Sequence, residues 1–365
     1  MLRGLKIKNA FSIKELDMSF IKGKYGYKKE MVNKNIVSPI TIYGNNGSGK
    51  SSVVNALNDL VNLLISDKEK FYPLIANFNN KSQESEIELV FNVEEDEYKY
   101  SLKTSFLDSN IKYEALFINN VVVFTRNENR TIIEDKEYEV NDGLFLSIRE
   151  LYSRIDELKE NKKVIKIAYD YLTNICVIKG DNSICNSKLL NFKNVEKLMV
   201  ENNEEIKRVL SNYEGMQLFD YFNDNDSDYL NIYSKSGKSF RLPGFLISDG
   251  MFTLTKILSI LINLDSDSLL VIDGVERNLH PSAIVFLINE ARKKEIQLLF
   301  TSHNTSLMQE FRPDQIYFAR WKNGYSYYFR LSGIYENIRE INNIEKMYLS
   351  NTFDEAINEI INIEQ

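Results

Sequence analysis

The sequence contains little of what metal and disulfide frameworks need, with two cysteines and two histidines among 365 residues. Cys176 and Cys185 stand alone, and their spacing matches no zinc-binding pattern, so the sequence excludes a zinc module. We expect both to be structural thiols in the reduced state, as is usual in cytoplasmic proteins. Because histidines are so scarce, a nuclease centre built on a histidine cluster is excluded as well.

Long apolar runs and an excess of positive charge are also absent. No run reaches the roughly 20 residues that cross a bilayer, and residues 1–6 lack the apolar stretch of a secretory signal. The formal net charge is -7, whereas a protein that binds nucleic acid over its whole surface is usually basic. We therefore expect a cytoplasmic protein with no membrane partner, in which any contact with DNA is confined to a local patch or belongs to a partner.

What the sequence does contain is a phosphate-binding loop. Gly44–Ser51 reads Gly-Asn-Asn-Gly-Ser-Gly-Lys-Ser and fits G-x-x-x-x-G-K-[ST]. Residues 36–43 predict a strand and the residues after the motif predict a helix, which is the context that the motif requires and which a chance glycine-rich turn would lack. Lys50 is predicted to reach the β- and γ-phosphates of ATP, and Ser51 to bind Mg²⁺. The predicted nucleotide-binding residues here are Gly44, Asn45, Asn46, Gly47, Ser48, Gly49, Lys50, Ser51 and Ser52.

The hydrophobic pattern changes several times along the chain. Residues 2–20 alternate and predict two strands, and residues 85–135 predict an antiparallel β-meander. Apolar residues recur at helical spacing over 143–212. We therefore expect a nucleotide-binding domain formed by residues 1–135 and 245–333, a helical insertion at 136–244, and a helical tail at 334–365.

Three further stretches carry candidate chemistry. An apolar run ends in Asp273, the Walker B pattern in which the acid holds Mg²⁺. Residues 297–302 predict another buried strand, and His303 follows directly. Upstream, residues 248–250 (Ser-Asp-Gly) precede a helix with an apolar face, and a serine N-cap alone would explain them.

Taken together, the serial order of these motifs resembles ATP-binding-cassette (ABC-type) ATPases. Within that class the chain resembles the bacterial AAA-family ATPases grouped with abortive-infection and OLD-like proteins, which are relatives of RecF and of SMC heads. The resemblance implies an α/β fold with a central, mostly parallel sheet. The matching segments are Gly44–Ser51, Ile247–Gly250, Asp273–Pro281 and Thr301–Asn304.

The resemblance also implies a head-to-tail dimer that holds two ATP molecules between its subunits. In such a dimer, residues 248–250 of one subunit would cap the γ-phosphate that Lys50 and Ser51 hold on the other. His303 would be the switch histidine that touches the γ-phosphate. Dimerisation would then depend on an intact γ-phosphate. The further nucleotide contacts that the resemblance implies are Ser248, Asp249 and Gly250.

One position departs from the family pattern. The family usually has glutamate directly after the Walker B aspartate, where it polarises the attacking water, but here that residue is Gly274. Glycine cannot act as a base, and loss of a general base costs about a hundred- to ten-thousand-fold in rate. Three hypotheses remain: Glu276 takes the role, a partner supplies the group, or the site hydrolyses ATP slowly and works as an ATP-gated clamp or sensor. We favour slow hydrolysis and keep Glu276 and His303 as the candidate catalytic residues.

Two functions are compatible with these features. In the first, the chain is the ATPase and sensor subunit of an anti-phage (abortive infection) defence system and controls a separate toxic effector, such as a nuclease, because its own sequence carries no nuclease motif. In the alternative, it is a RecF- or SMC-like repair ATPase that clamps DNA, which the net acidity disfavours. The tail at 334–365 is expected to pack on the chain's own core rather than dock a partner.

Overall fold

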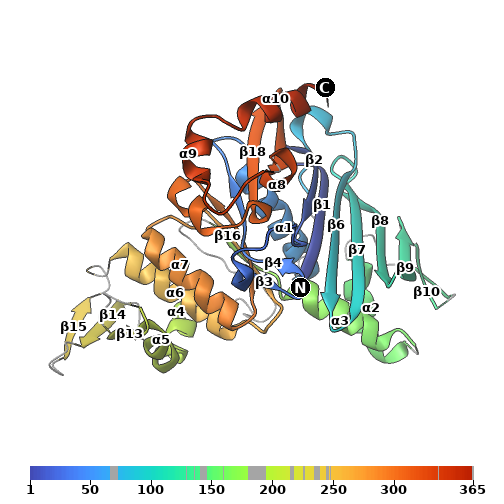
Figure 1. The fold of residues 1–365 in the computed structure, drawn as a ribbon. Coiled ribbons are helices and arrows are strands. Elements are labelled where there is room, and N and C mark those ends of the chain that lie inside the picture. Colours follow the sequence, from blue (N-terminus) through green and yellow to red (C-terminus); the bar gives the residue numbers. More distant parts are fainter. Residues whose placement is uncertain are drawn as a thin grey trace.

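One large sheet organises the molecule (Figure 1). The computed structural model describes residues 1–65, 73–128, 130–134, 136–139, 146–158, 160–179, 195–213, 218–224, 227–233, 239–243, 246, 248–335 and 337–363. Within these ranges the sheet has 14 strands, in the order β11-β10-β9-β8-β7-β6-β1-β2-β19-β18-β5-β17-β16-β12. No helix in the same ranges is long and apolar enough to cross a membrane.

The strands at one end of this sheet are parallel. Their backbones pair β18 with β5, β5 with β17, β17 with β16, and β16 with β12. Because parallel strands end at the same edge, the loops that follow β5, β16 and β17 meet there. The five strands are β5 (Ile40–Tyr43), β12 (Cys176–Lys179), β16 (Leu269–Asp273), β17 (Gln297–Ser302) and β18 (Ile316–Lys322).

The other end of the sheet is antiparallel, and the predicted meander over 85–135 is confirmed. The two strands expected within 2–20 are also present and pair with each other. β19 (Tyr325–Arg330) connects the two halves, because it runs antiparallel to β18 and parallel to β2. The antiparallel strands are β1 (Leu2–Ala10), β2 (Ile13–Ser19), β6 (Ser85–Val93), β7 (Asp96–Ser105), β8 (Asn110–Ile118), β9 (Val121–Asn127), β10 (Arg130–Ile133) and β11 (Lys136–Glu139).

Two apolar clusters cover the two faces of the parallel strands. Alternation along β16 divides them, since Val271 belongs to one cluster and Leu270 and Ile272 to the other. The first cluster includes α1, α2, α3 and the meander, and the second includes α4 to α7 and the C-terminal tail. The helices are α1 (Lys50–Ile65), α2 (Ser147–Ser153), α3 (Lys162–Thr173), α4 (Val195–Glu201), α5 (Asn203–Leu210), α6 (Asp249–Asn263) and α7 (Pro281–Lys293).

The expectation that residues 136–244 form a helical insertion is wrong for part of that segment. It does contain α2 to α5, but it also supplies β11 and β12 to the large sheet and a separate three-stranded antiparallel sheet. Helical spacing over 143–212 does not predict these short strands, and β12 pairs with the distant β16. The domain boundaries themselves stay a prediction. The separate sheet consists of β13 (Leu218–Asp224), β14 (Ser227–Tyr233) and β15 (Ser239–Pro243).

The expected reduced state of the cysteines also needs correction. Cys176, the first residue of β12, is fully buried and is disulfide-bonded in this structure. Cys185 lies outside the described residues. Sequence spacing carried no information on this bond, because it argued only against a zinc site.

The C-terminal tail packs on the chain's own core, as expected. Phe353, Ile357 and Ile361 are buried in the second cluster, and the rings of Phe353 and Phe318 are stacked with centroids 5.4 Å apart. The tail contains α8 (Leu331–Ile334), α9 (Ile344–Leu349) and α10 (Asp354–Ile363).

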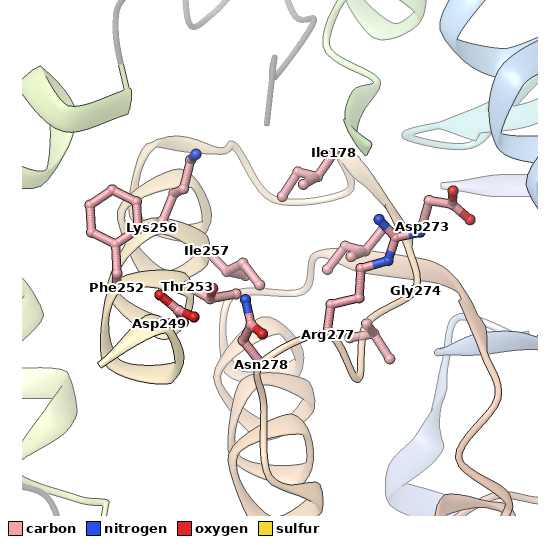
Figure 2. A pocket seen from close by; sticks show the side chains of 12 residues that line it. Ile178, Asp249, Phe252, Thr253, Lys256, Ile257, Asp273, Gly274, Arg277 and Asn278 are labelled. Carbon is pink, nitrogen blue, oxygen red and sulfur yellow. The ribbon is translucent and has the colours of Figure 1, made fainter. Parts of the chain in front are cut away.

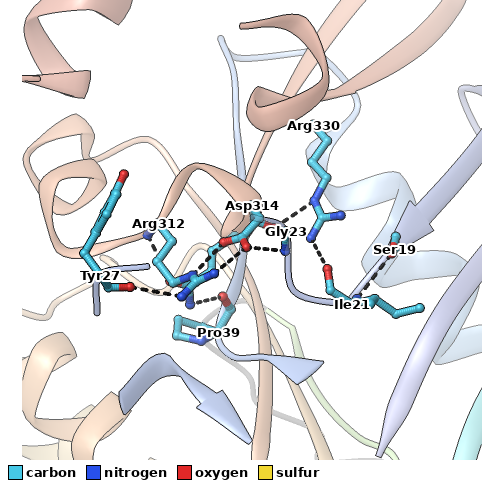
Figure 3. Close-up of polar contacts among 9 residues, drawn as sticks. Ser19, Ile21, Gly23, Tyr27, Pro39, Arg312, Asp314 and Arg330 are labelled. Carbon is cyan, nitrogen blue, oxygen red and sulfur yellow. Dashed lines mark hydrogen bonds and ion pairs between the residues drawn. The ribbon is translucent and has the colours of Figure 1, made fainter. Parts of the chain in front are cut away.

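A buried ion pair lies just before β18, at the edge of the sheet where β5 and β18 begin (Figure 3). The phosphate-binding loop lies at the opposite edge, where β5 ends. The Arg312 and Asp314 side chains are 1% and 0% exposed, with Nη2 of the arginine 2.8 Å from Oδ2 of the aspartate. Gly23 donates its backbone N–H to the same Oδ2 at 2.6 Å, and Arg312 Nη1 donates to the Tyr27 carbonyl at 3.0 Å. The long loop after β2 is thereby attached to the start of β18. That loop contains a 3₁₀ turn (Lys29–Met31), β3 (Val32–Asn33) and β4 (Ile36–Val37), and the strand expected over 36–43 is divided before Pro39, which has no N–H to donate.

Candidate nucleotide-binding site

The phosphate-binding loop connects β5 to α1, which is the strand–loop–helix arrangement that the motif predicts. Its glycines are required by close contacts. A Cβ on Gly44 would lie 2.5 Å from the Ala319 carbonyl oxygen, and one on Gly49, whose φ is +95°, would lie 1.9 Å from Ser326 Oγ. Asn45, Asn46 and Gly47 form the exposed tip of the loop.

Lys50 is almost fully buried, with 6% of the residue exposed. Its Nζ donates to the carbonyl oxygens of Gly44 at 2.8 Å and Asn45 at 2.9 Å. Burial lowers the pKa of Lys50, and the carboxylates of Glu276 and Asp273 act in the opposite direction. The ammonium group is therefore held by neutral acceptors at the mouth of the loop, where anionic phosphate oxygens would bind it more strongly.

Asp273 and Ser51 lie together, although 222 residues separate them. Ser51 Oγ donates to Asp273 Oδ1 at 2.9 Å, and Thr301 Oγ1 donates to the same oxygen at 2.7 Å. Thr301 in turn accepts the backbone N–H of Gly274 at 2.7 Å. A hydroxyl and a carboxylate oxygen are the donors that Mg²⁺ takes from phosphate-binding loops and Walker B strands.

A hydrogen bond joins the backbone of His303 to the side chain of Glu276. The His303 N–H donates to Glu276 Oε1 at 2.9 Å, and Oε2 of the same carboxylate is buried without a hydrogen-bond partner in the described part of the chain. Burial lowers the pKa of His303, and the Lys50 ammonium lowers it further. The imidazole is therefore neutral at pH 7 and able to either donate or accept a hydrogen bond.

The second histidine, His280, has a structural role. It is the N-cap of α7, where its ring accepts the backbone N–H of Ser282 at 3.3 Å, and Pro281 begins the helix.

Ser248, Asp249 and Gly250 occupy the start of α6, away from the phosphate-binding loop. Ser248 Oγ accepts the backbone N–H of Met251 at 3.3 Å, so the predicted N-cap is present. Asp249 lines a cavity of about 380 Å³ whose opposite wall carries Asp273 and Arg277 (Figure 2). No residue of the phosphate-binding loop lines that cavity. Within one chain the structure thus brings Lys50, Ser51, Asp273, Glu276 and His303 together, whereas residues 248–250 face a different space.

Comparison with known proteins agrees with this arrangement. Residues 40–309 match the AAA_21 family, described as "AAA domain, putative AbiEii toxin, Type IV TA system". That match spans well over half of the 365 residues. The chain belongs to the AAA_21 family. No curated protein matches the sequence.

Solved structures similar to this AAA_21 chain include heads of SMC proteins. The SMC head domain from Thermotoga maritima has 15% identity and a TM-score of 0.48, over 90% of this chain and 98% of that chain. An SMC head with an extended coiled coil, bound to the C-terminal domain of ScpA and derived from Pyrococcus furiosus, has 14% identity and a TM-score of 0.45, over 90% and 95% of the two chains.

The structure adds residues to the AAA_21 site that the sequence did not indicate. Ser12 lies in the turn between β1 and β2. Its Oγ is 2.7 Å from Ser52 Oγ and 2.7 Å from Ser326 Oγ. Tyr328 donates its hydroxyl to the Gly49 carbonyl at 2.7 Å. Ser52 therefore faces this hydroxyl cluster, and its contact with nucleotide stays a prediction. No local pattern marks Ser12 or Tyr328, because both reach the loop through sheet pairing.

The residues present fit ATP and Mg²⁺. Ser48 Oγ is buried and has no hydrogen-bond partner among the described residues, the backbone at Gly44 and Gly49 leaves no room for side chains, and Ser51 and Asp273 offer two oxygen donors. ATP·Mg²⁺, when bound, supplies a triphosphate and the cation that offsets part of its charge. Lys50 would hold the β- and γ-phosphates, and Ser51 and Asp273 would hold the metal.

Proposed function

We propose that this AAA_21 ATPase binds ATP·Mg²⁺ at the Gly44–Ser51 loop and uses it to hold two copies of the chain together. Hydrolysis is slow in this proposal, so the bound nucleotide works as a latch. The observation that carries the proposal is the hydrogen bond of 2.9 Å from Ser51 Oγ to Asp273 Oδ1, which joins the two predicted metal-binding residues in one place. A coincidental glycine-rich turn would not be accompanied by such a contact.

The position of residues 248–250 supports a second copy. The phosphate-binding loop follows β5, whereas the cavity beside Asp249 is lined by residues of β16. In the order β5-β17-β16 these strands are two spacings apart, or roughly 10 Å at the usual strand spacing. Ser248 and Asp249 are exposed at the start of their helix. A partner chain in head-to-tail orientation would bring its own Ser248, Asp249 and Gly250 to the γ-phosphate.

This dimer has a direct test by sedimentation velocity. With Mg²⁺ and a non-hydrolysable ATP analogue the protein should sediment as a dimer, and with ADP as a monomer. Ser248→Arg should bind the analogue as wild type does and remain monomeric. The bulky arginine would stand where Ser248 is proposed to meet the γ-phosphate on the partner chain, and would keep the two chains apart. A dimer that forms equally without nucleotide, or that survives Ser248→Arg, would contradict the proposal.

The biological role that we propose is control of a separate toxic effector, such as a nuclease, in an anti-phage system. Its support is the family description, which names a putative toxin and a toxin–antitoxin system, and the lack of a nuclease motif in the sequence. The alternative is a DNA clamp. Salt-sensitive, ATP-dependent binding of duplex DNA by the purified protein would favour that alternative.

Slow hydrolysis predicts tight ATP binding with little turnover. The position after Asp273 is glycine, and loss of a general base costs about a hundred- to ten-thousand-fold. Phosphate release from ATP should therefore be close to that of Lys50→Ala, which serves as the blank. Measured turnover well above this blank that collapses in Glu276→Gln would show instead that Glu276 acts as the base, and the latch proposal would be wrong.

A further inference from the structure

The Arg277 side chain lies against the position that a Cβ on residue 274 would occupy. Gly274 has a φ of +68°, and a Cβ built on it would lie 2.8 Å from Arg277 Nε and 3.4 Å from Arg277 Cδ. A side chain at position 274 in this backbone would therefore displace Arg277. The turn is held by a hydrogen bond of 3.0 Å from the Arg277 N–H to the Gly274 carbonyl.

Arg277 is exposed and lines the cavity beside Asp249, together with Asp273, which also accepts a hydrogen bond from Ser51 of the phosphate-binding loop. Among the described residues its guanidinium makes no hydrogen bond or ion pair, although Asp249 and Asp273 line the same cavity. Figure 2 shows its side chain beside Gly274, on the wall that carries Asp273. Its charge reaches the nucleotide side as well, because Arg277 adds to the effect of burial and Lys50 in lowering the pKa of His303. An exposed arginine with these neighbours is available for an anionic ligand.

We propose that Arg277 contacts the γ-phosphate of ATP bound to its own chain and makes the site discriminate ATP from ADP. This inference rests on the proposed nucleotide binding. In related ATPases the residue after the Walker B aspartate is a carboxylate, which repels phosphate oxygens, whereas Gly274 and Arg277 together reverse the sign of the charge at that place. A planar guanidinium can donate two parallel N–H groups to a phosphate. The exchange of an acid for a cation suits a site that retains ATP rather than hydrolysing it.

Calorimetric titration tests the contact without relying on turnover. Wild type and Arg277→Gln are titrated with Mg²⁺-ADP and with a non-hydrolysable ATP analogue, at a protein concentration at which sedimentation shows monomers. For Arg277→Gln we expect the Kd of the analogue to rise about tenfold, the loss of a charged hydrogen bond, and the Kd of ADP to change by less than about twofold. Arg277→Lys should recover part of the affinity for the analogue. Arg130→Gln is the matched control, because Arg130 has a side chain 74% exposed on β10, in the meander.

Each remaining outcome is decisive. Equal weakening of both nucleotides, or no weakening, would overturn the role of Arg277. If Arg277→Gln weakened binding of the analogue only in the dimer, Arg277 would contact the partner's nucleotide. That result would also overturn the proposed contact within one chain. If wild type binds both nucleotides and Lys50→Ala does not, but Arg277→Gln behaves as wild type, the inference fails while the proposed function stands. If wild type binds neither nucleotide, both fail.

Discussion

Lys50→Ala is expected to lower the affinity for ATP about a hundredfold, because the loss of charged hydrogen bonds to two phosphates is not compensated by water. The Lys50 ammonium is buried at the mouth of the phosphate-binding loop, where it bonds to the Gly44 and Asn45 carbonyl oxygens. It is thus poised beside the predicted phosphate position. The measurement is isothermal titration calorimetry of the Mg²⁺-bound, non-hydrolysable ATP analogue with wild type and variant.

The matched control is Lys28, a lysine of intermediate burial. Lys28 also donates to backbone carbonyls, those of Gln309 and Phe311, and burial lowers its pKa as it does for Lys50. Lys28 lies in the long loop after β2, and its contacts are at the edge of the sheet opposite the phosphate-binding loop. Lys28→Ala should bind the analogue within about twofold of wild type, since it removes no phosphate contact. Equal losses in the two variants would mean that Lys50 acts through stability and not through phosphate.

Asp314→Ala is expected to lower the free energy of unfolding by about 3–5 kcal/mol, because it leaves the Arg312 guanidinium buried without its counter-charge. The pair is almost completely excluded from solvent. The same substitution removes the acceptor of the Gly23 N–H, so the loop after β2 loses one of its contacts as well (Figure 3). Urea unfolding followed by circular dichroism measures the change.

A partly exposed ion pair supplies the comparison for this prediction. Arg320 Nη2 lies 2.9 Å from Asp354 Oδ1, and the two side chains are 22% and 38% exposed. Asp354→Ala should cost less than about 1 kcal/mol, since water solvates the arginine that remains. Replacing both buried partners, Arg312→Met with Asp314→Leu, should recover part of the loss. Similar costs for Asp314→Ala and Asp354→Ala would refute the argument from burial.

The parts of the site that the sequence predicted are local in the chain. Gly44–Ser51 carries its own context, because the flanking strand and helix are contiguous with it. The meander over 85–135 was predictable for the same reason, since each of its strands pairs with the next. Asp273 ends one short apolar strand and His303 follows another, and in a parallel sheet such ends must lie at one edge.

The parts that were missed depend on pairing between distant segments. Among the described residues β12 pairs only with β16, more than ninety positions later in the sequence. The strands between 218 and 243 form a separate sheet that the helical spacing over 143–212 did not predict. Glu114 is a fully buried acid in the meander that accepts the backbone N–H groups of Ser147 and Ile148 at the start of α2. Nothing in the alternation of β8 distinguishes it from a solvent-facing residue.

By itself, the sequence determined that this chain has a phosphate-binding loop, a Walker B strand and no acid directly after it. Residue identity and short-range order are enough for those statements, because backbone conformation in glycine-rich turns and apolar strands is a local property. Only the tertiary structure decided that Ser51 and Asp273 share a hydrogen bond, that Tyr328 and Ser12 support the loop, and that Arg277 lies where Gly274 leaves space. These contacts depend on side-chain direction across the sheet and around one left-handed glycine, which no linear spacing encodes.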